Sequence, residues 1–152
     1  MRSRRKGFTL IEVLIVIVVI AVLASIVIPR LLGAGRQAKE ASLRATLQEL
    51  RNSIGLFQSH TGTYPAALGD IMAAATAPPA TGLDVTGASV GINATDYQGP
   101  YLTTADGNLP DNPITGGNVA GTDWIYGTTA PDVGSVHAAA GSALDGTDYS
   151  TW

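Results

Sequence analysis

A continuous apolar run dominates the first part of the chain. It covers residues 8–28, and Glu12 is its one charged side chain. As an α-helix, the run is long enough to cross a hydrocarbon layer of roughly 30 Å. A carboxylate in hydrocarbon costs several kcal/mol unless it finds a partner or a proton, so Glu12 is a candidate functional residue.

Helical periodicity continues beyond this run. Leu43, Leu47, Leu50, Ile54 and Phe57 follow one another at spacings of four and three residues, which places them in one stripe of an amphipathic helix. The pattern predicts that the helix continues over residues 29–59 and packs this stripe against a globular part.

Pro29 lies at the junction of the two helical patterns. It removes a backbone N–H group, its ring clashes with the preceding turn, and Gly33 and Gly35 follow closely. We expect either a kink or an interruption of the helix here.

Turn residues end the amphipathic helix near residue 60. Gly62 is the expected C-cap, and Pro65 cannot continue the helix. A short helix over residues 66–75 should follow, with Leu68, Ile71 and Met72 on its inner face. Residues 76–96 are rich in Ala, Thr, Gly and Pro and predict an exposed loop.

The last third of the chain predicts a small antiparallel sheet. Residues 123–127 and 133–137 form the expected hairpin, and Trp124 and Tyr126 alternate onto its core face. The predicted fold is thus α+β, with a long N-terminal α-helix packed on a small antiparallel β-sheet head. The helix comprises residues 8–28 and 29–59, and the head comprises residues 60–152.

Charges are divided unevenly along the chain. Arg2, Arg4, Arg5 and Lys6 precede the apolar run, whereas residues 52–152 contain nine aspartates and no Lys or Arg. Basic residues mark the cytoplasmic end of a membrane helix, so the rest of the chain should be exported. An acidic domain repels nucleic-acid phosphate, which argues against nucleic acid as a partner. The chain has no cysteine, so no disulfide stabilises this domain.

The start of the apolar run resembles the class III signal of type IV pilins and of the pseudopilins of type II secretion. The resemblance rests on the basic border, Gly7, Phe8, Thr9, Glu12, the unbroken apolar helix and Pro29. It implies a pilin-like fold. It also implies that a prepilin peptidase removes residues 1–7 as a leader peptide, by cleavage between Gly7 and Phe8, and methylates the new amino terminus.

The resemblance implies assembly roles for Phe8, Thr9, Glu12 and Pro29. Cleavage would create a positive amine on Phe8, which could meet the Glu12 carboxylate of a neighbouring copy in a filament. A copy in the wrong axial register would leave the carboxylate unpaired at low dielectric, so this pair would set the register. Around Pro29 the helix could unwind locally in the filament, and a simple kink is the alternative.

Two plainer interpretations of the N-terminus stay open. An ordinary secretory signal could be cleaved after Ala24, or the apolar helix could be a simple signal-anchor. Neither accounts for Glu12, and the apolar run continues past Ala24 to Ile28.

The C-terminal segment, residues 141–152, is a candidate calcium site. Calcium takes six to eight oxygen ligands, which carboxylates and backbone carbonyls of a glycine-containing loop can supply. The resemblance implies Asp145 and Asp148 as ligands, although Tyr149 follows Asp148 where the family usually has a second, adjacent aspartate. A plain surface turn is the alternative.

Catalytic motifs are missing from the sequence. His60 and His137 have no cysteine to join in a transition-metal site, and there is no nucleophile elbow, phosphate loop or His-Glu-x-x-His motif. We expect a protein that is not an enzyme.

The sequence therefore predicts a structural subunit of a type IV filament, most like the major, G-type pseudopilin of a type II secretion system. Expected partners are further copies of the chain, the prepilin peptidase, minor pseudopilins, the assembly platform and its ATPase. The expected location is the bacterial inner membrane, with the N-terminus in the cytoplasm and the head in the periplasm, and then a filament. A type IV pilin for adhesion or motility is the alternative, and a membrane-anchored periplasmic binding module is the third possibility.

Overall fold

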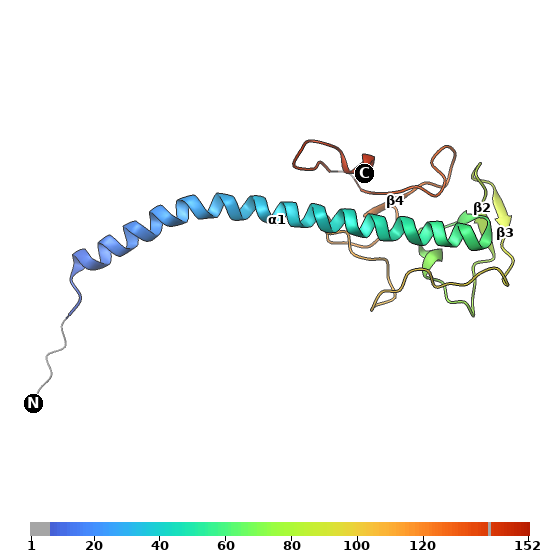
Figure 1. Cartoon of the computed structure of the whole chain (residues 1–152), viewed down its shortest axis with the longest axis horizontal. Helices are drawn as coiled ribbons and strands as arrows, with labels where there is room; N and C mark the ends of the chain where they lie inside the picture. Colours follow the sequence, from blue (N-terminus) through green and yellow to red (C-terminus); the bar gives the residue numbers. More distant parts are fainter. Residues whose placement is uncertain (1–6, 140) are drawn as a thin grey trace, which may run out of the picture. The chain divides into compact units, whose positions relative to one another are not determined.

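The computed structural model describes residues 7–139 and 141–152, without the side chains of residues 29–32. It forms two compact units, Met1–Ala38 and Lys39–Trp152. The elements in chain order are α1 (Leu10–Thr61), β1 (Tyr64–Pro65), the 3₁₀ helix η1 (Leu68–Met72), β2 (Thr81–Leu83), β3 (Ser89–Gly91), β4 (Trp124–Tyr126), β5 (Val136–Ala138) and the 3₁₀ helix η2 (Tyr149–Thr151) (Figure 1). This arrangement confirms the predicted α+β fold with a long N-terminal helix.

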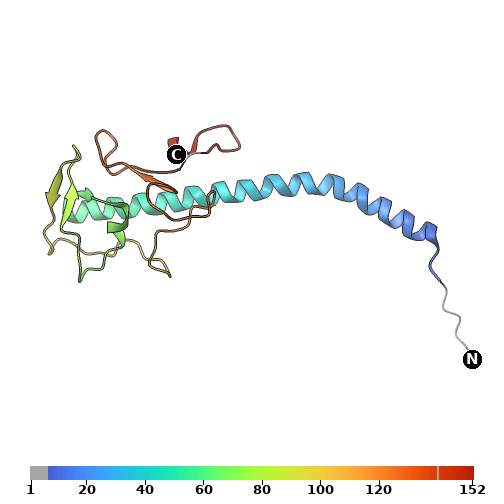
Figure 2. The ribbon, with the colours of Figure 1, turned by 180° about the vertical axis from the view of Figure 1, so that it is seen from behind.

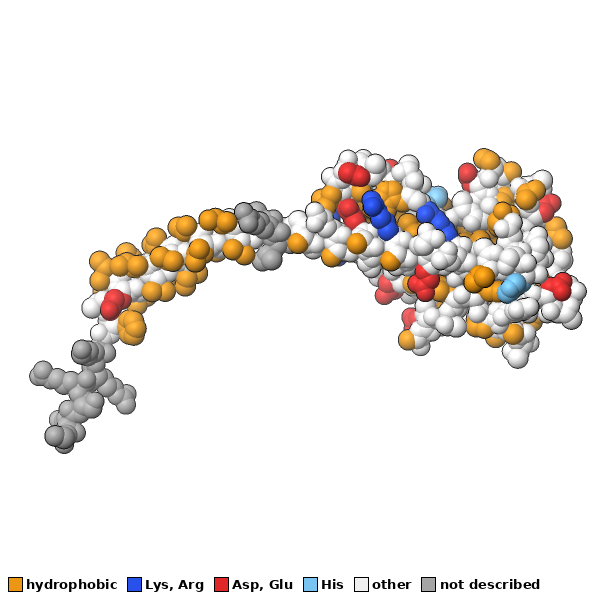
Figure 3. All heavy atoms as spheres, in the orientation of Figure 1, with side chains coloured by type: hydrophobic (Ala, Val, Ile, Leu, Met, Phe, Trp, Pro, Cys, Tyr) orange, Lys and Arg blue, Asp and Glu red, His pale blue; other side chains and the backbone are white. Residues whose placement is uncertain are grey.

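The first unit consists of the N-terminal part of α1. Its large apolar side chains are exposed, from Leu10 to Ile28, and they cover the visible surface of this part of the helix (Figure 3). By length and composition, α1 contains a segment that can cross a membrane. The apolar run is thus one helix that presents hydrocarbon on all sides, as a lipid-facing or bundle-facing helix does.

Pro29 does not interrupt α1. The backbone is helical at every residue from Leu10 to Thr61, and Figures 1 and 2 show α1 without a break. Of the two expected alternatives, a kink or an interruption, the single chain does not show the interruption. A proline removes one hydrogen bond and costs about 3 kcal/mol, and the long helical stretches on both sides keep the backbone helical across it. Local unwinding in a filament stays a prediction.

The second unit has its core on the predicted stripe of α1. Leu43, Leu47, Leu50, Ile54 and Phe57 are at most 3% exposed, which confirms the periodicity. They form one cluster with side chains of the later elements, namely Leu68, Ile71, Trp124, Val136 and Tyr149. The burial of one helix face by residues distant in sequence is what makes this unit compact.

The end of α1 also follows the prediction. The helix ends at Thr61, and Gly62 has a φ of 72° while its N–H group donates to the Gln58 carbonyl at 2.8 Å. This left-handed conformation favours glycine, and the hydrogen bond satisfies one of the last helical carbonyls.

Two predicted segments differ from the structure. The helix expected over residues 66–75 is only the five-residue η1. The Asp70 carboxylate caps its start by accepting a 2.8 Å hydrogen bond from the Ala67 N–H, and the backbone is already extended at Ala73, with a ψ of 139°. The loop expected over residues 76–96 contains the β2–β3 hairpin. Asp84 fixes its turn by accepting hydrogen bonds from the N–H groups of Thr86 and Ala88 at 2.8 and 3.0 Å.

Two small antiparallel sheets complete the second unit. In the first, β2 pairs with β1 through Tyr64 and Leu83 and with β3 through Gly82 and Val90. The second is the predicted β4–β5 hairpin, which pairs Ile125 with His137. In β4, Trp124 is fully buried, and the Tyr126 hydroxyl donates to the Pro65 carbonyl at 2.8 Å. The hairpin thereby contacts the segment that follows α1.

Candidate functional site

The Gly7–Phe8 peptide bond lies in an exposed, non-helical segment. Residues 7–9 precede α1, and Phe8 is 86% exposed. A Cβ atom placed on Gly7 would meet no atom within 4 Å. The bond predicted for cleavage is therefore accessible. The basic border of residues 1–6 lies outside the described residues.

Thr9 and Glu12 form a capping box at the start of α1. The Thr9 N–H and hydroxyl groups both donate to Oε2 of Glu12, at 2.8 and 2.7 Å. The Glu12 N–H group donates to the Thr9 hydroxyl oxygen at 3.3 Å. This reciprocal arrangement satisfies backbone donors that the first turn of a helix otherwise leaves open. In the single chain, Glu12 thus has a partner three residues away.

The capping box escaped the sequence analysis, although its signal was present. A Thr followed three residues later by Glu, directly before an apolar run, is the usual signature of this motif. Thr9 and Glu12 thus have a local role at the start of α1 in addition to the assembly roles predicted for them.

The geometry leaves part of the Glu12 carboxylate for another donor. Both hydrogen bonds from Thr9 end on Oε2, so Oε1 can accept a hydrogen bond from a group outside the described chain. An amine at Phe8 of another copy is of the right charge to use it, and a charge-assisted hydrogen bond of this kind is stronger than a neutral one.

Asp145 and Asp148 both lie in the C-terminal loop and bind its backbone. Oδ1 of Asp145 accepts from the Thr147 hydroxyl and N–H groups at 2.6 and 3.0 Å, and Oδ1 of Asp148 accepts from the Ser150 N–H at 2.8 Å. The hydrogen bonds from Thr147 and from Ser150 lower the pKa of Asp145 and of Asp148, respectively. Both side chains are therefore anionic at neutral pH.

These two carboxylates supply only part of a calcium shell. Among the described residues, no group of three or more His, Cys, Asp or Glu side chains is arranged to hold a metal. A calcium ion at this loop would take its remaining oxygen ligands from backbone carbonyls and water. The calcium site stays a prediction.

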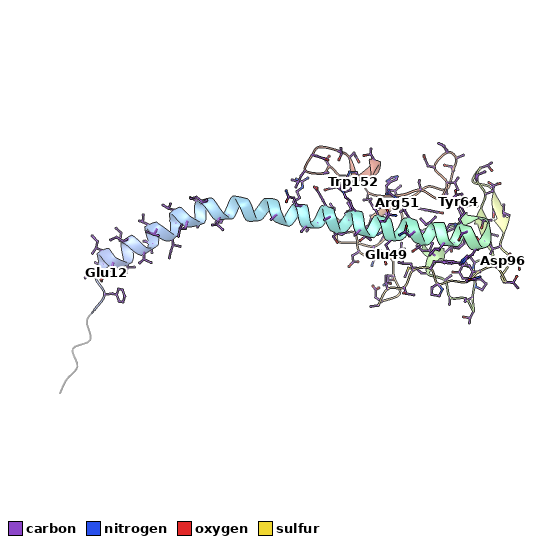
Figure 4. All side chains as sticks on the ribbon, viewed as in Figure 1. Glu12, Glu49, Arg51, Tyr64, Asp96 and Trp152 are labelled. Atoms are coloured by element: carbon purple, nitrogen blue, oxygen red, sulfur yellow. The ribbon has the colours of Figure 1, made fainter. Side chains whose placement is uncertain are left out.

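Three side chains of α1 hold the C-terminal segment, and we call Glu40, Arg44 and Arg51 the C-terminal clasp. Oε1 of Glu40 accepts from the Leu144 N–H at 2.7 Å. The Arg44 guanidinium lies over the Trp152 ring, and Arg51 donates to the Val136 carbonyl at 3.0 Å and to the Trp152 carbonyl. Figure 4 shows Arg51 and Trp152 on the same side of α1. The sequence shows that the three lie on one helix, but not which distant segment they bind.

Comparisons with known proteins agree with the N-terminal geometry. Residues 2–28 match the prokaryotic N-terminal methylation motif. The chain is 34% identical to the type II secretion system core protein G of Klebsiella pneumoniae, over 51% of this chain and 56% of that protein. The corresponding protein of Escherichia coli is 34% identical over 51% of this chain and 55% of its own length.

A pilus protein is also similar to the chain. The type IV wide pilus major component PilA4 of Thermus thermophilus is 42% identical over 39% of this chain and 45% of its own length. The chain thus spans about half the length of the relatives that it matches. No solved structure matches it.

The methylation motif begins at the basic border and ends with the apolar run, so it contains the Gly7–Phe8 bond and the capping box. The matched proteins are of the two kinds, pseudopilin and pilin, that the N-terminal residues resemble. The chain therefore carries the prokaryotic N-terminal methylation motif, and over about half of its length it is similar to the core protein G of type II secretion systems.

Proposed function

We propose that this protein is the structural subunit of a pseudopilus in a type II secretion system. The observation that carries the proposal is the Thr9–Glu12 capping box, which lies directly after the accessible Gly7–Phe8 bond and at the start of an exposed apolar helix. Thr9 occupies only Oε2 of Glu12, so this carboxylate can cap its own helix and still accept a hydrogen bond from a neighbouring copy, and an ionisable residue within an apolar span is a candidate functional residue.

Processing prepares the subunit for assembly. A prepilin peptidase cleaves after Gly7, and the methylated Phe8 amine carries a positive charge next to the capping box. The apolar part of α1 anchors the subunit in the inner membrane, with the leader on the cytoplasmic side and residues 39–152 in the periplasm.

Assembly pairs the charges of neighbouring copies. The Phe8 amine of an incoming copy reaches Oε1 of a Glu12 already in the filament, while Thr9 continues to hold Oε2. In hydrocarbon this contact forms only in one axial register, because any other register leaves a charge unpaired. An assembly platform with its ATPase, and minor pseudopilins, complete the machine that lifts the subunits out of the membrane.

A type IV pilin is the second candidate function. The similarity to the wide pilus component of Thermus thermophilus favours it. The two functions share the processing and the assembly chemistry. They differ in the product, which is a short periplasmic fibre for the pseudopilin and a long surface fibre for the pilin.

Mass spectrometry of the protein from its native membrane tests the shared part. We expect a mature chain that begins at Phe8 and carries one additional methyl group. A chain that begins at Ser25, or one that retains Met1, would overturn the filament proposal. Deletion of the gene then separates the two functions, since loss of protein secretion indicates a pseudopilin and loss of a surface fibre indicates a pilin.

A further inference from the structure

One cation of the second unit has no partner among the described residues. This unit contains three basic side chains, Lys39, Arg44 and Arg51. Arg44 and Arg51 belong to the C-terminal clasp. Lys39 is exposed, and it makes no hydrogen bond, ion pair or ring contact with any residue that the structure describes.

Most carboxylates of the unit are occupied by their own loops. Six aspartates accept hydrogen bonds from nearby N–H groups: Asp70, Asp84, Asp106, Asp123, Asp145 and Asp148. Glu49 differs from them, because it is exposed on α1 and its carboxylate makes no hydrogen bond with the described residues.

Glu49 borders a groove on the side of α1 away from the clasp. The groove has a volume of about 510 Å³ and lies between α1 and residues 101–103. Leu56, which is 50% exposed, lines the same groove. Figure 4 shows Glu49 on the opposite side of α1 from Arg51 and Trp152. The groove thus places the Glu49 carboxylate near the half-exposed Leu56 side chain, which suits the charged end and the methylene stem of a lysine.

We propose that this groove, the Glu49 groove, is a contact surface for a second copy of the chain, and that it receives Lys39 of that copy. The proposal rests on the proposed filament function. The chain's own Lys39 cannot reach the groove, because ten residues of helix separate it from Glu49 by about 15 Å. Residues 52–152 offer no other Lys or Arg, so the complementary cation has to come from a neighbour.

The same direction of offset serves this pair and the Phe8–Glu12 pair. In both pairs the cation precedes the carboxylate along the chain, and α1 is one continuous helix. The displacement differs between the pairs, because four residues separate Phe8 from Glu12 and ten separate Lys39 from Glu49, so each carboxylate meets the cation of a different neighbouring copy. Pairs of this kind contribute little affinity at a surface, but they select register and orientation.

Carbodiimide cross-linking of assembled filaments tests the contact directly. This reagent joins an amine to a carboxylate only when the two touch, and Lys39 is the only lysine in residues 8–152. Filaments are assembled from a mixture of ordinary and ¹⁵N-labelled copies, so that a link between copies has a mixed mass. We expect a mixed-label peptide that joins Lys39 to Glu49. A link from Lys39 to Asp96, Asp111 or Asp132 instead, or no link at Lys39, would overturn the proposal.

Charge reversal gives an independent readout. We expect Lys39→Glu and Glu49→Lys each to reduce the amount of filament severalfold, and the double variant to restore most of it. Full assembly of either single variant, or a double variant no better than the single ones, would contradict the contact. If one of these results is found while the unchanged chain still forms filaments with a normally processed Phe8, only the Lys39–Glu49 contact is overturned, and the proposed function stands. Absence of any filament from the unchanged chain would instead overturn the proposed function.

Discussion

The guanidinium carbon of Arg44 lies 4.1 Å from the centroid of the Trp152 ring. Trp152 also packs edge-on against Tyr149, with 4.9 Å between the ring centroids. Tyr149 is 2% exposed and belongs to the core. A cation of α1 and a core tyrosine therefore hold the same indole, so that the C-terminal segment is packed on the helix without a disulfide.

Replacement of Arg44 tests the stabilising effect of this contact. We expect Arg44→Gln to lower the free energy of unfolding by roughly 0.5–1 kcal/mol, because the cation–π interaction of this exposed side chain is lost. Arg44→Lys should retain part of the stability, since it keeps a cation at this position. Denaturant unfolding of the full chain in detergent, followed by tryptophan fluorescence, measures both. Equal midpoints for Arg44→Gln and the unchanged chain would show that the contact contributes nothing.

Helix α1 offers a matched pair of leucines, Leu50 inside the buried stripe and Leu56 outside it. Leu50 is fully buried and Leu56 is 50% exposed on the same helix. We expect Leu50→Ala to destabilise the second unit by roughly 2–5 kcal/mol, because it removes buried methyl groups and leaves a cavity. Leu56→Ala should change stability by less than about 0.5 kcal/mol, as surface substitutions do. Thermal unfolding compares the two variants, and similar losses would mean that the stripe is not the core.

Replacement of Glu12 tests whether its carboxylate sets the axial register of neighbouring copies during assembly. We expect Glu12→Ala and Glu12→Val to insert into the membrane normally and to form no filaments, because the partner of the Phe8 amine is lost. Ile11→Ala, which changes a neighbouring apolar residue, is the control and should assemble. Membrane fractionation and electron microscopy of sheared fibres give the two readouts. Normal fibres from either Glu12 variant would rule out the register role.

Asp123 makes stability depend on pH. A hydrogen bond from the Thr115 side chain, and one from the Val119 N–H group, lower the pKa of this carboxyl group below its usual value. The unfolded chain, in which the pKa is about 3.9, then binds more protons than the folded chain as the pH falls toward the folded pKa. The stabilisation is therefore fully present above about pH 5 and is lost as the pH falls through the folded pKa.

The corresponding experiment compares melting temperatures across pH. We expect Asp123→Asn to melt at a lower temperature than the unchanged chain at pH 7, because an amide is a weaker acceptor for the Val119 N–H group than a carboxylate is. The difference should narrow between about pH 5 and pH 3. If the difference in melting temperature between the two proteins stays constant over this pH range, Asp123 is not a source of the acid sensitivity.

The calcium prediction from the C-terminal loop has its own test. If the carboxylates of Asp145 and Asp148 bind calcium, EDTA should lower the melting temperature by several degrees, and added calcium should restore it. Asp145→Asn with Asp148→Asn should remove the response to both reagents. A melting temperature that EDTA leaves unchanged would contradict calcium binding, and the C-terminal clasp would then hold the segment alone.

Local patterns in the sequence were sufficient to predict which residues of α1 are buried and where this helix ends. The stripe from Leu43 to Phe57 and the C-cap at Gly62 depend on spacing and on backbone conformation within a few residues, and the structure confirms both. A kink or an interruption was expected at Pro29, and the helix is not interrupted there, since a single lost hydrogen bond does not outweigh the helical residues around it. The β2 and β3 strands escaped prediction because three-residue strands are too short to show alternation.

The sequence by itself determined the N-terminal chemistry of this protein. The Gly7–Phe8 bond, Thr9 and Glu12 lie within six residues of one another, so their relation depends only on local geometry. Only the tertiary structure decided which segment the C-terminal clasp binds. It also decided that the side chains of Lys39 and Glu49 make no hydrogen bond or ion pair with the other described residues. Those relations depend on which distant segments pack on each face of α1, and helical periodicity identifies the faces without identifying what covers them.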